Sequence, residues 1–159
     1  MEICPQEAKT FDSDLAYVKS LLYKKERVVV SLDPSYRGLL DYEDSGQIVD
    51  ALLKLGFSQV RETAEGAAII TREYVRLMKE GKMDNIIVTS CPAIVYLVEK
   101  HYPMLIPYLA PVVSPMIAHG RWIKDRMGQH TKVVFIGPCV AKKMEAEADS
   151  RTRGCVDAV

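Results

Sequence analysis

The sequence predicts an α/β domain, with a mostly parallel sheet of about four strands and helices on both faces. Short β-branched apolar runs alternate with longer segments whose apolar residues recur at helical spacing. Strands that alternate with helices in this way usually pair in parallel, because each helix carries the chain back across the sheet. The 159 residues are 48% apolar and 26% charged, which is enough for one domain with a sizeable core.

The first predicted elements are a helix at 16–22 and a strand at 27–32. The apolar residues of the helix share one face. The run "RVVVSL" (27–32) is β-branched and continuous, which is typical of a strand buried on both faces. The segment "DPSYRG" (33–38) predicts a turn after this strand.

Another helix is predicted at 47–56, where Asp44 or Ser45 supplies the N-cap. Its last residue is a glycine, which suits the left-handed position that follows a helix. Residues 57–63 alternate between apolar and polar side chains and predict a second strand. Residues 66–81 predict a third helix, which again ends at a glycine.

Two more predicted helices begin with a proline. One covers 92–102, and the other covers 114–128 with Ser114 as its N-cap. Proline is tolerated in the first turn because the missing N–H has no helical partner there. The predicted strands of this part are 85–90 and 132–137, with the start of another at 155–159.

Composition excludes several classes of partner. The formal net charge is zero, so there is no basic excess for nucleic acid. No apolar run reaches the roughly 18–20 residues of a membrane span. The first 15 residues carry acidic side chains and no long apolar core, unlike a signal peptide. We therefore expect a cytoplasmic protein without nucleic-acid or membrane partners.

Four cysteines in a cytoplasmic protein are expected to be free thiols or metal ligands. Ligands of parallel sheets gather outside the carboxyl ends of the strands. Cys91 and Cys139 each follow a predicted strand and each neighbour a proline. A thiol at a helix N-terminus is favoured as thiolate, the form that binds metal. A cysteine at a strand end is also commonly a small buried apolar residue, and the residues alone leave both interpretations open.

Two segments resemble the signature motifs of one family. "VTSCPAIVYLVEKHYP" (88–103) and "GPCVAKKMEAEA" (137–148) resemble the first two motifs of the iron-only, or [FeFe], hydrogenase catalytic domain. Those motifs read T-S-C-C-P-G-W and M-P-C-x-x-K-x-x-E. The segment "VVSPMIAHG" (112–120) resembles the family's stretch between them. The resemblance runs from about residue 27 to the end of the chain.

The N-terminus carries a second resemblance. "ICPQEAKT" (3–10) is similar to the end of a bacterial ferredoxin motif, with Cys4 as the last cluster ligand. The resemblance implies that residues 1–12 are the tail of a ferredoxin-like module. Residues 13–159 would be the truncated N-terminal lobe of a hydrogenase-like H-cluster domain. The implied partners are the missing second lobe, a ferredoxin-type electron carrier and H₂ or protons, and exposed apolar surface would favour a dimer.

The family's active site is the H-cluster, a [4Fe–4S] cubane joined to a di-iron unit with carbon monoxide and cyanide ligands. The resemblance implies that Cys91 and Cys139 match two of the four cubane ligands. Lys142 would donate hydrogen bonds to an iron-bound cyanide, and Glu145 would pair with that lysine. The other residues implied to line the cofactor are Pro34, Ser35, Ser114, Pro115 and Pro138. We expect the cofactor to be absent from this piece alone.

The chain departs from the family along the implied proton path. Glu73 matches one relay glutamate, while Arg76 stands where the second is expected and Ala110 replaces a relay serine. Ser90 replaces the relay cysteine, and a hydroxyl is far less acidic than a thiol, whose pKa is about 8.5. The resemblance therefore implies hydrogen sensing or redox signalling rather than fast H₂ turnover, as in the family's sensory branch. For this piece we expect no enzymatic activity.

Two alternatives stay open. The same strand ends suit a flavodoxin-like module that binds a small anion, although "SLDPSYRG" (31–38) is no glycine-rich phosphate loop. The cysteines also suit a metal-free thiol redox sensor. Iron and sulfide analysis distinguishes these alternatives from the cluster-binding domain.

Overall fold

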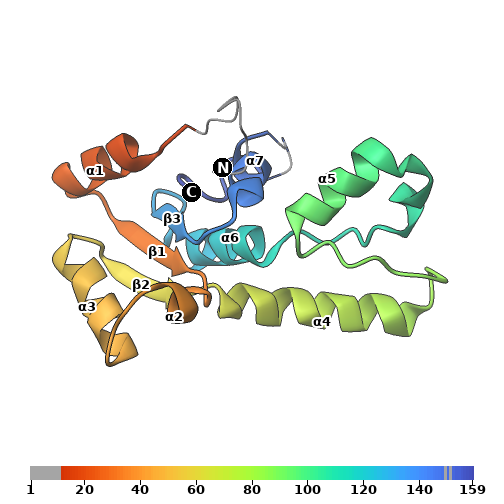
Figure 1. Cartoon of the computed structure of the whole chain (residues 1–159), viewed down its shortest axis with the longest axis horizontal. Coiled ribbons are helices and arrows are strands. Elements are labelled where there is room, and N and C mark those ends of the chain that lie inside the picture. Colours follow the sequence, from red (N-terminus) through yellow and green to blue (C-terminus); the bar gives the residue numbers. More distant parts are fainter. Residues whose placement is uncertain (1–11, 149, 151) are drawn as a thin grey trace.

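The computed structural model describes residues 12–148, 150 and 152–159. A parallel sheet lies at its centre, with strand order β2–β1–β3 (Figure 1). The strands are β1 (Val28–Leu32), β2 (Gln59–Glu62) and β3 (Lys132–Ile136). Every residue of β1 is buried, because this strand pairs on both sides and is covered on both faces. The predicted fold class is therefore confirmed.

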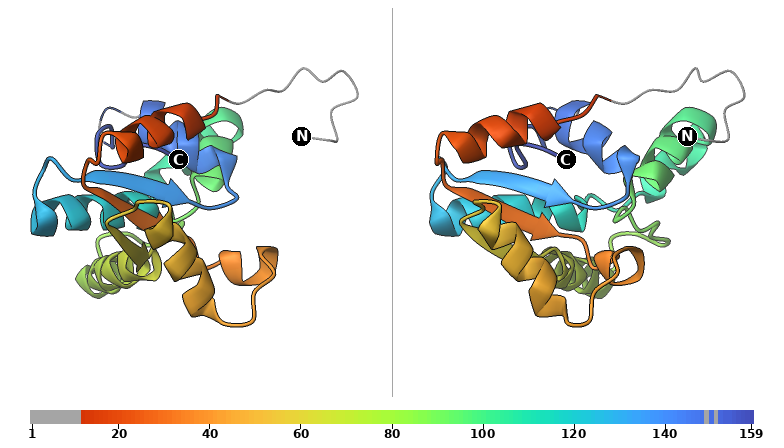
Figure 2. Two further views of the ribbon diagram at one scale, coloured as in Figure 1. Left: turned by 90° about the vertical axis from the view of Figure 1, so that its left-hand side faces the viewer. Right: turned by 60° about the vertical axis from the view of Figure 1, so that its left-hand side comes forward.

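Helices cover both faces of the sheet, as the views in Figure 2 show. On one face, α1 (Leu15–Tyr23) and α3 (Ser45–Lys54) pack against alternate β1 residues. On the other face, α6 (Pro115–Met127) packs against β1 and β3, and α4 (Ala64–Glu80) packs on α6. The remaining elements are α2 (Tyr36–Leu39), α5 (Pro92–His101), the 3₁₀ helix η1 (Pro103–Tyr108) and α7 (Val140–Ala148).

Local sequence signals set the helix ends as expected. The Asp44 side chain caps α3 by accepting a hydrogen bond from the Gly46 N–H at 2.7 Å. The Ser114 hydroxyl caps α6 by accepting from the Ile117 N–H at 3.4 Å. Gly81 ends α4 in the left-handed region, with φ of 61°, where side chains are strained.

The predicted strand at 85–90 is wrong. In this segment Ile87 forms a single parallel bridge with Leu109, outside the sheet. The segment pairs with Leu109 rather than with an outer edge of the sheet, at β2 or β3, and Val88 remains 50% exposed. The predicted start of a strand at 155–159 is likewise reduced to one bridge, from Ala158 to Val134. The sheet accordingly has three strands among the described residues rather than about four.

Helices α4 and α6 cross in close contact at Gly66. A Cβ atom on Gly66 would lie 2.1 Å from the Pro115 carbonyl oxygen and 2.8 Å from the Cβ of His119. Only glycine permits this approach, because the nearest atom belongs to the backbone of the other helix. The crossing places the start of α6 against the start of α4.

An ion-pair cluster joins residues near the two ends of the described chain. The Asp14 carboxylate lies 2.6 Å from the Lys143 ammonium and accepts a hydrogen bond from the Val159 N–H at 2.8 Å. The same ammonium lies 3.2 Å from Glu147. We call Asp14, Lys143 and Val159 the terminal clasp. The clasp ties α7 to Asp14, the residue that precedes α1.

Candidate metal centre

Cys91 stands at the first turn of α5. It is the N-cap residue, with extended backbone (φ −110°, ψ 108°), and its thiol makes no capping hydrogen bond. The Cys91 carbonyl accepts hydrogen bonds from the Ile94 and Val95 N–H groups. The residue is exposed and its sulfur is a free thiol. Pro92 begins α5 and is buried, so the helix start is anchored while the thiol is accessible.

Thr89 anchors the segment that leads to Cys91. Its side chain is buried, and its hydroxyl donates to the Val112 carbonyl at 2.6 Å. Its backbone N–H donates to the Tyr74 hydroxyl at 2.9 Å, and the two hydroxyl oxygens lie 3.1 Å apart. Tyr74, which is adjacent to Glu73 on α4, was not predicted from the sequence. No sequence signal identified Tyr74, because its contact with Thr89 is a matter of packing.

Cys139 lies in the short loop between β3 and α7. It is partly buried, its sulfur is a free thiol, and its carbonyl accepts a hydrogen bond from the Lys142 N–H at 3.2 Å. The Lys142 ammonium lies 5.6 Å from the centre of the buried Phe135 ring. Lys142 is therefore one turn from Cys139 and is directed over the end of β3. Pro138, between β3 and Cys139, is exposed.

The structure brings the two cysteine-bearing helix starts to one side of the molecule. Helices α5 and α7 are in contact, and in Figures 1 and 2 their N-terminal ends lie close together. Cys91 immediately precedes α5, and Cys139 immediately precedes α7. Each thiol therefore lies at the N-terminal end of a helix. We expected the two cysteines to meet at the ends of two strands of the sheet. Cys139 does follow β3, but Cys91 follows a segment outside the sheet, so the two cysteines share helix starts instead.

The loop after β1 joins the same region. The Asp33 side chain accepts a hydrogen bond from the Ser35 N–H at 3.0 Å, and the Asp33 N–H donates to the Ile136 carbonyl. A Cβ on Gly137 would lie 2.8 Å from the Asp33 Cβ, so this loop and the Cys139 loop pack tightly. The Ser35 hydroxyl oxygen is buried without a hydrogen-bond partner in the described structure. Pro34 is exposed at the tip of the loop.

Glu145 connects α7 to the start of α6. Its carboxylate accepts a hydrogen bond from the backbone N–H of Ser114 at 3.2 Å. Ser114 is wholly buried, and Pro115 follows it at the first position of α6. The carboxylate that the resemblance pairs with Lys142 is therefore bonded to a backbone amide, while the Lys142 ammonium lies over Phe135.

Glu73 is directed toward a surface ion pair. Its carboxylate contacts Arg76, which also pairs with Glu80. The hydrogen bond from Arg76 lowers the pKa of Glu73, although desolvation acts in the opposite sense. Its charged form is thus stabilised. Ser90, the other implied relay residue, is partly buried beside Cys91.

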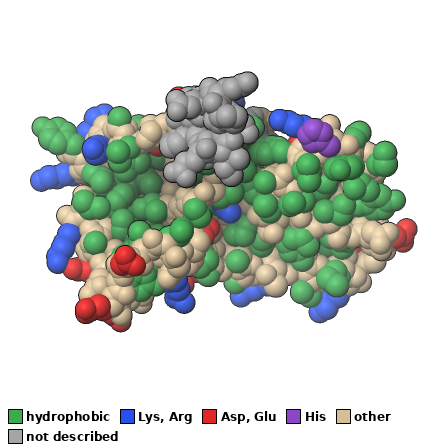
Figure 3. Space-filling view, viewed as in Figure 1, with side chains coloured by type: hydrophobic (Ala, Val, Ile, Leu, Met, Phe, Trp, Pro, Cys, Tyr) green, Lys and Arg blue, Asp and Glu red, His purple; other side chains and the backbone are tan. Residues whose placement is uncertain are grey.

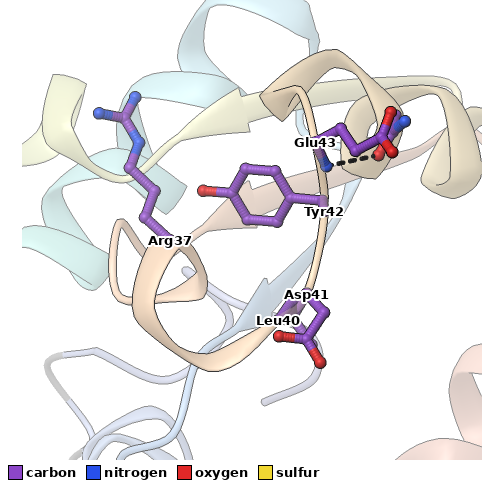
Figure 4. Close-up of a pocket in the computed structure, with 6 residues that line it drawn as sticks. Arg37, Leu40, Asp41, Tyr42 and Glu43 are labelled. Carbon is purple, nitrogen blue, oxygen red and sulfur yellow. Dashed lines mark hydrogen bonds between the residues drawn. The ribbon is translucent and has the colours of Figure 1, made fainter.

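Two hollows mark the surface. A cavity of about 650 Å³ lies between α5, the 109–113 segment and α7, and Thr89, Pro92 and Glu145 are among its lining residues. A wide-open hollow of about 760 Å³ lies between α2 and α3, lined by Arg37, Leu40, Asp41, Tyr42, Glu43 and Gln47. Figure 4 shows the Tyr42 ring between the Arg37 side chain and Glu43, whose N–H donates to Gln47. Arg37 is paired with Glu62 at 3.1 Å, so its charge is already compensated.

The thiols fit part of the ligand set of a four-iron cluster, which is held by cysteine thiolates. Within 12–148, 150 and 152–159, no three His, Cys, Asp or Glu side chains gather as a metal site. Cys4, the third predicted metal ligand, lies outside the described residues. The same holds for the predicted ferredoxin-like tail at 1–12, except for Asp12. The described chain thus offers two thiols, an ammonium and a buried hydroxyl around one region. No described helix has the length and apolar character to cross a bilayer.

Residues 26–159 match the family described as "Iron only hydrogenase large subunit, C-terminal domain". The chain is also 31% identical over 102 residues to the cytosolic Fe-S cluster assembly factor NAR1 of Yarrowia lipolytica. That alignment covers 60% of this chain and 21% of the relative. The chain therefore spans about a fifth of the length of this curated relative.

Solved structures share the fold. The [FeFe]-hydrogenase HydA(deltaEFG) matches with a TM-score of 0.69 and 24% identity over 93% of this chain and 44% of that chain. A variant of the [FeFe]-hydrogenase HydA1 from Chlamydomonas reinhardtii matches with a TM-score of 0.67, 24% identity and the same coverages. This chain spans less than half the length of both structures.

Proposed function

Since this chain belongs to the family formed by the C-terminal domain of the iron-only hydrogenase large subunit, we propose that it is a cluster-holding lobe of an H-cluster-type site. Cys91 and Cys139 supply two thiolate ligands to an iron–sulfur cluster. When bound, such a cluster exchanges electrons. The role is hydrogen sensing or redox signalling in the cytoplasm rather than rapid H₂ turnover.

The observation that supports this proposal most is the contact between α5 and α7. These two helices begin beside the two cysteines, which are 48 residues apart in sequence. Both thiols are free, and the Cys91 thiol is exposed. Soft thiolate ligands at helix N-termini suit iron–sulfur binding.

Two more groups support an anionic ligand at this place. The Lys142 ammonium is stabilised over the Phe135 ring one turn from Cys139, where it is a compact donor. The buried hydroxyl of Ser35 has no hydrogen-bond partner in the described structure and is available to a ligand.

The residues at the implied proton-relay positions do not support fast H₂ turnover. Ser90 carries a weakly acidic hydroxyl beside Cys91, and Ala110, which has no transferable proton, is buried near Thr89. Glu73 is engaged by Arg76 at the surface. None of these three side chains offers an acid whose pKa matches neutral pH.

The similarity to NAR1 favours a second candidate function. In it, the same two cysteines hold an iron–sulfur cluster during its assembly rather than for hydrogen chemistry. This candidate requires neither a proton path nor catalytic turnover. A metal-free thiol sensor would use the same residues without iron.

We further propose that the second lobe of the domain covers the apolar surface of α5 and η1, and that a ferredoxin-type carrier supplies electrons. Figure 3 shows hydrophobic side chains gathered over this part of the molecule. The exposed residues there include Ile94, Leu97, Met104, Ile106 and Tyr108. Without a cover, such a surface favours dimerisation.

Anaerobic reconstitution with iron and sulfide tests the proposal. In the protein that carries the second lobe proposed above, we expect both to bind, and Cys91→Ser or Cys139→Ser to lower bound iron and the sulfur-to-iron absorption to background. Cys155→Ser is the matched control and should retain the iron. Iron content that is unchanged in both test variants would overturn the proposal, and absence of iron from the wild type would favour the thiol sensor.

A further inference from the structure

Tyr74 connects helix α4 to the segment that carries Cys91. Its hydroxyl oxygen accepts a hydrogen bond from the Thr89 N–H at 2.9 Å and lies 3.1 Å from the Thr89 hydroxyl. Tyr74 is partly buried, and Thr89 is 6% exposed. One phenol thus satisfies two polar groups of a residue that lies two positions before Cys91.

Thr89 is also bonded on its other side. Its hydroxyl donates to the Val112 carbonyl at 2.6 Å and lies 3.1 Å from the Ala110 carbonyl. The Thr89 hydroxyl has one proton and donates it to Val112. In the contact between the two hydroxyls, Tyr74 is therefore the donor. Tyr74 then donates to the Thr89 oxygen and accepts from the Thr89 nitrogen. Three segments of the chain meet at Thr89.

No strand of the sheet holds the Cys91 segment. Its only described backbone pairing before Thr89 is at Ile87, which donates to the Tyr108 carbonyl and accepts from the Ala110 N–H. Tyr108 and Ala110 lie at the end of η1 and in the segment after it, and neither belongs to the sheet. The link from Tyr74 therefore ties this segment to α4, which packs on α6 and so on the core.

We propose that Tyr74 is a positioning residue for Cys91, whose hydroxyl fixes the Thr89 backbone and thereby the start of α5. The inference rests on the proposed function, because it takes Cys91 as a ligand that must be held near Cys139. A buried N–H that loses its acceptor is costly, so removal of the phenol oxygen releases the segment. The neighbouring Glu73 cannot take over, because it is directed to Arg76.

Cross-linking of the two thiols tests the proposal in the full chain without any cluster. In a Cys4→Ser, Cys155→Ser background, a short bis-maleimide joins Cys91 to Cys139 only when the sulfurs approach. We expect Tyr74→Phe to slow cross-linking about fivefold relative to single alkylation, and to speed amide exchange at 89–95 by a similar factor. Tyr23→Phe removes a hydroxyl from a side chain that is 90% exposed, and it should change neither rate.

The outcomes separate the two proposals. Wild-type chain that is alkylated but never cross-linked would count against the shared metal site, and amide exchange at 89–95 would then decide the role of Tyr74. Equal exchange in the wild type and Tyr74→Phe, with both folded by circular dichroism, would overturn the positioning role. Faster exchange in Tyr74→Phe that leaves cross-linking unchanged would also overturn it, because the released segment would not move Cys91.

Discussion

The Nδ1 atom of His119 lies 2.8 Å from the hydroxyl oxygen of Ser31, and both side chains are wholly buried. The Ser31 hydroxyl also lies 2.8 Å from that of Thr63, so the contact joins β1, the start of α4 and α6. Burial lowers the pKa of His119 to about 4, with Glu65 raising it and Arg61 lowering it further. The ring is therefore neutral at physiological pH, and it can serve Ser31 as donor or acceptor.

Stability should depend on pH through His119. Its pKa is about 6.5 in the unfolded chain and about 4 in the fold, so the unfolded chain binds more protons between these values. We expect full stability above pH 6.5 and a loss of about 3 kcal/mol as pH falls toward 4. Urea unfolding at several pH values measures this. His119→Gln should flatten the dependence relative to the wild type, and the exposed His101→Gln should not; equal slopes in all three would refute the assignment.

Gly66→Ala should separate α4 from α6. The new methyl group would meet the Pro115 carbonyl at 2.1 Å, and backbone cannot move aside as a flexible side chain can. We expect a loss of about 3 kcal/mol in the free energy of unfolding. Gly38→Ala is the matched control, because nothing lies within 4 Å of its Cβ. A Gly66→Ala protein as stable as the control would show that the helices do not cross this closely.

Lys143 forms ion pairs within the terminal clasp and with Glu147, whereas its neighbour Lys142 packs on the Phe135 ring. Burial lowers the pKa of Lys143, but its bonds to Asp14 and Glu147 outweigh this and raise the pKa above 10.5. Its stabilisation is thus complete below pH 10.5 and is lost only as pH rises through the higher value. Lys143→Met should cost on the order of 2 kcal/mol, because Asp14 loses its partner.

Lys142→Met is the control for that change. The Lys142 ammonium contacts the Phe135 ring, so its removal should cost less than about 1 kcal/mol. Thermal and chemical unfolding compare the two variants. A larger loss for Lys142→Met would contradict the division between a lysine that anchors α7 and a lysine that packs on Phe135.

Gly137→Ala should disturb the packing between the loop after β1 and the loop that carries Cys139. Its methyl group would lie 2.7 Å from the Phe135 ring and 2.8 Å from the Asp33 Cβ, so the ring must move. We expect a loss of about 1–2 kcal/mol and a changed NMR environment for Phe135 and Lys142. Unchanged aromatic resonances of Phe135 would be inconsistent with the packing described.

The sequence predicted the elements that depend on local chemistry. Asp44, Ser114 and Gly81 mark helix ends because each satisfies or permits a specific backbone geometry at its own position. The continuous run at 28–32 predicted the buried central strand, because only a strand covered on both faces has no polar side. These signals need no knowledge of the rest of the chain.

The parts that depend on long-range packing were not predictable in the same way. Residues 85–90 have the composition of a strand, but Ile87 pairs with Leu109 outside the sheet, and local composition does not say which partner a strand will find. Tyr74 contacts Thr89 across 15 residues, and nothing in its local sequence distinguishes it from a core tyrosine. The resemblance named both cysteines, but only the contact of α5 with α7 shows how their helices meet.

The terminal clasp holds residues 14 and 159 next to each other. Asp14 and Val159 are directly hydrogen-bonded, so polypeptide entering at residue 14 and leaving at residue 159 starts from one spot. Lys143, in the helix that follows Cys139, completes that spot. Any segment joined before residue 14 would therefore lie beside any segment joined after residue 159, and both would border the helix that follows Cys139.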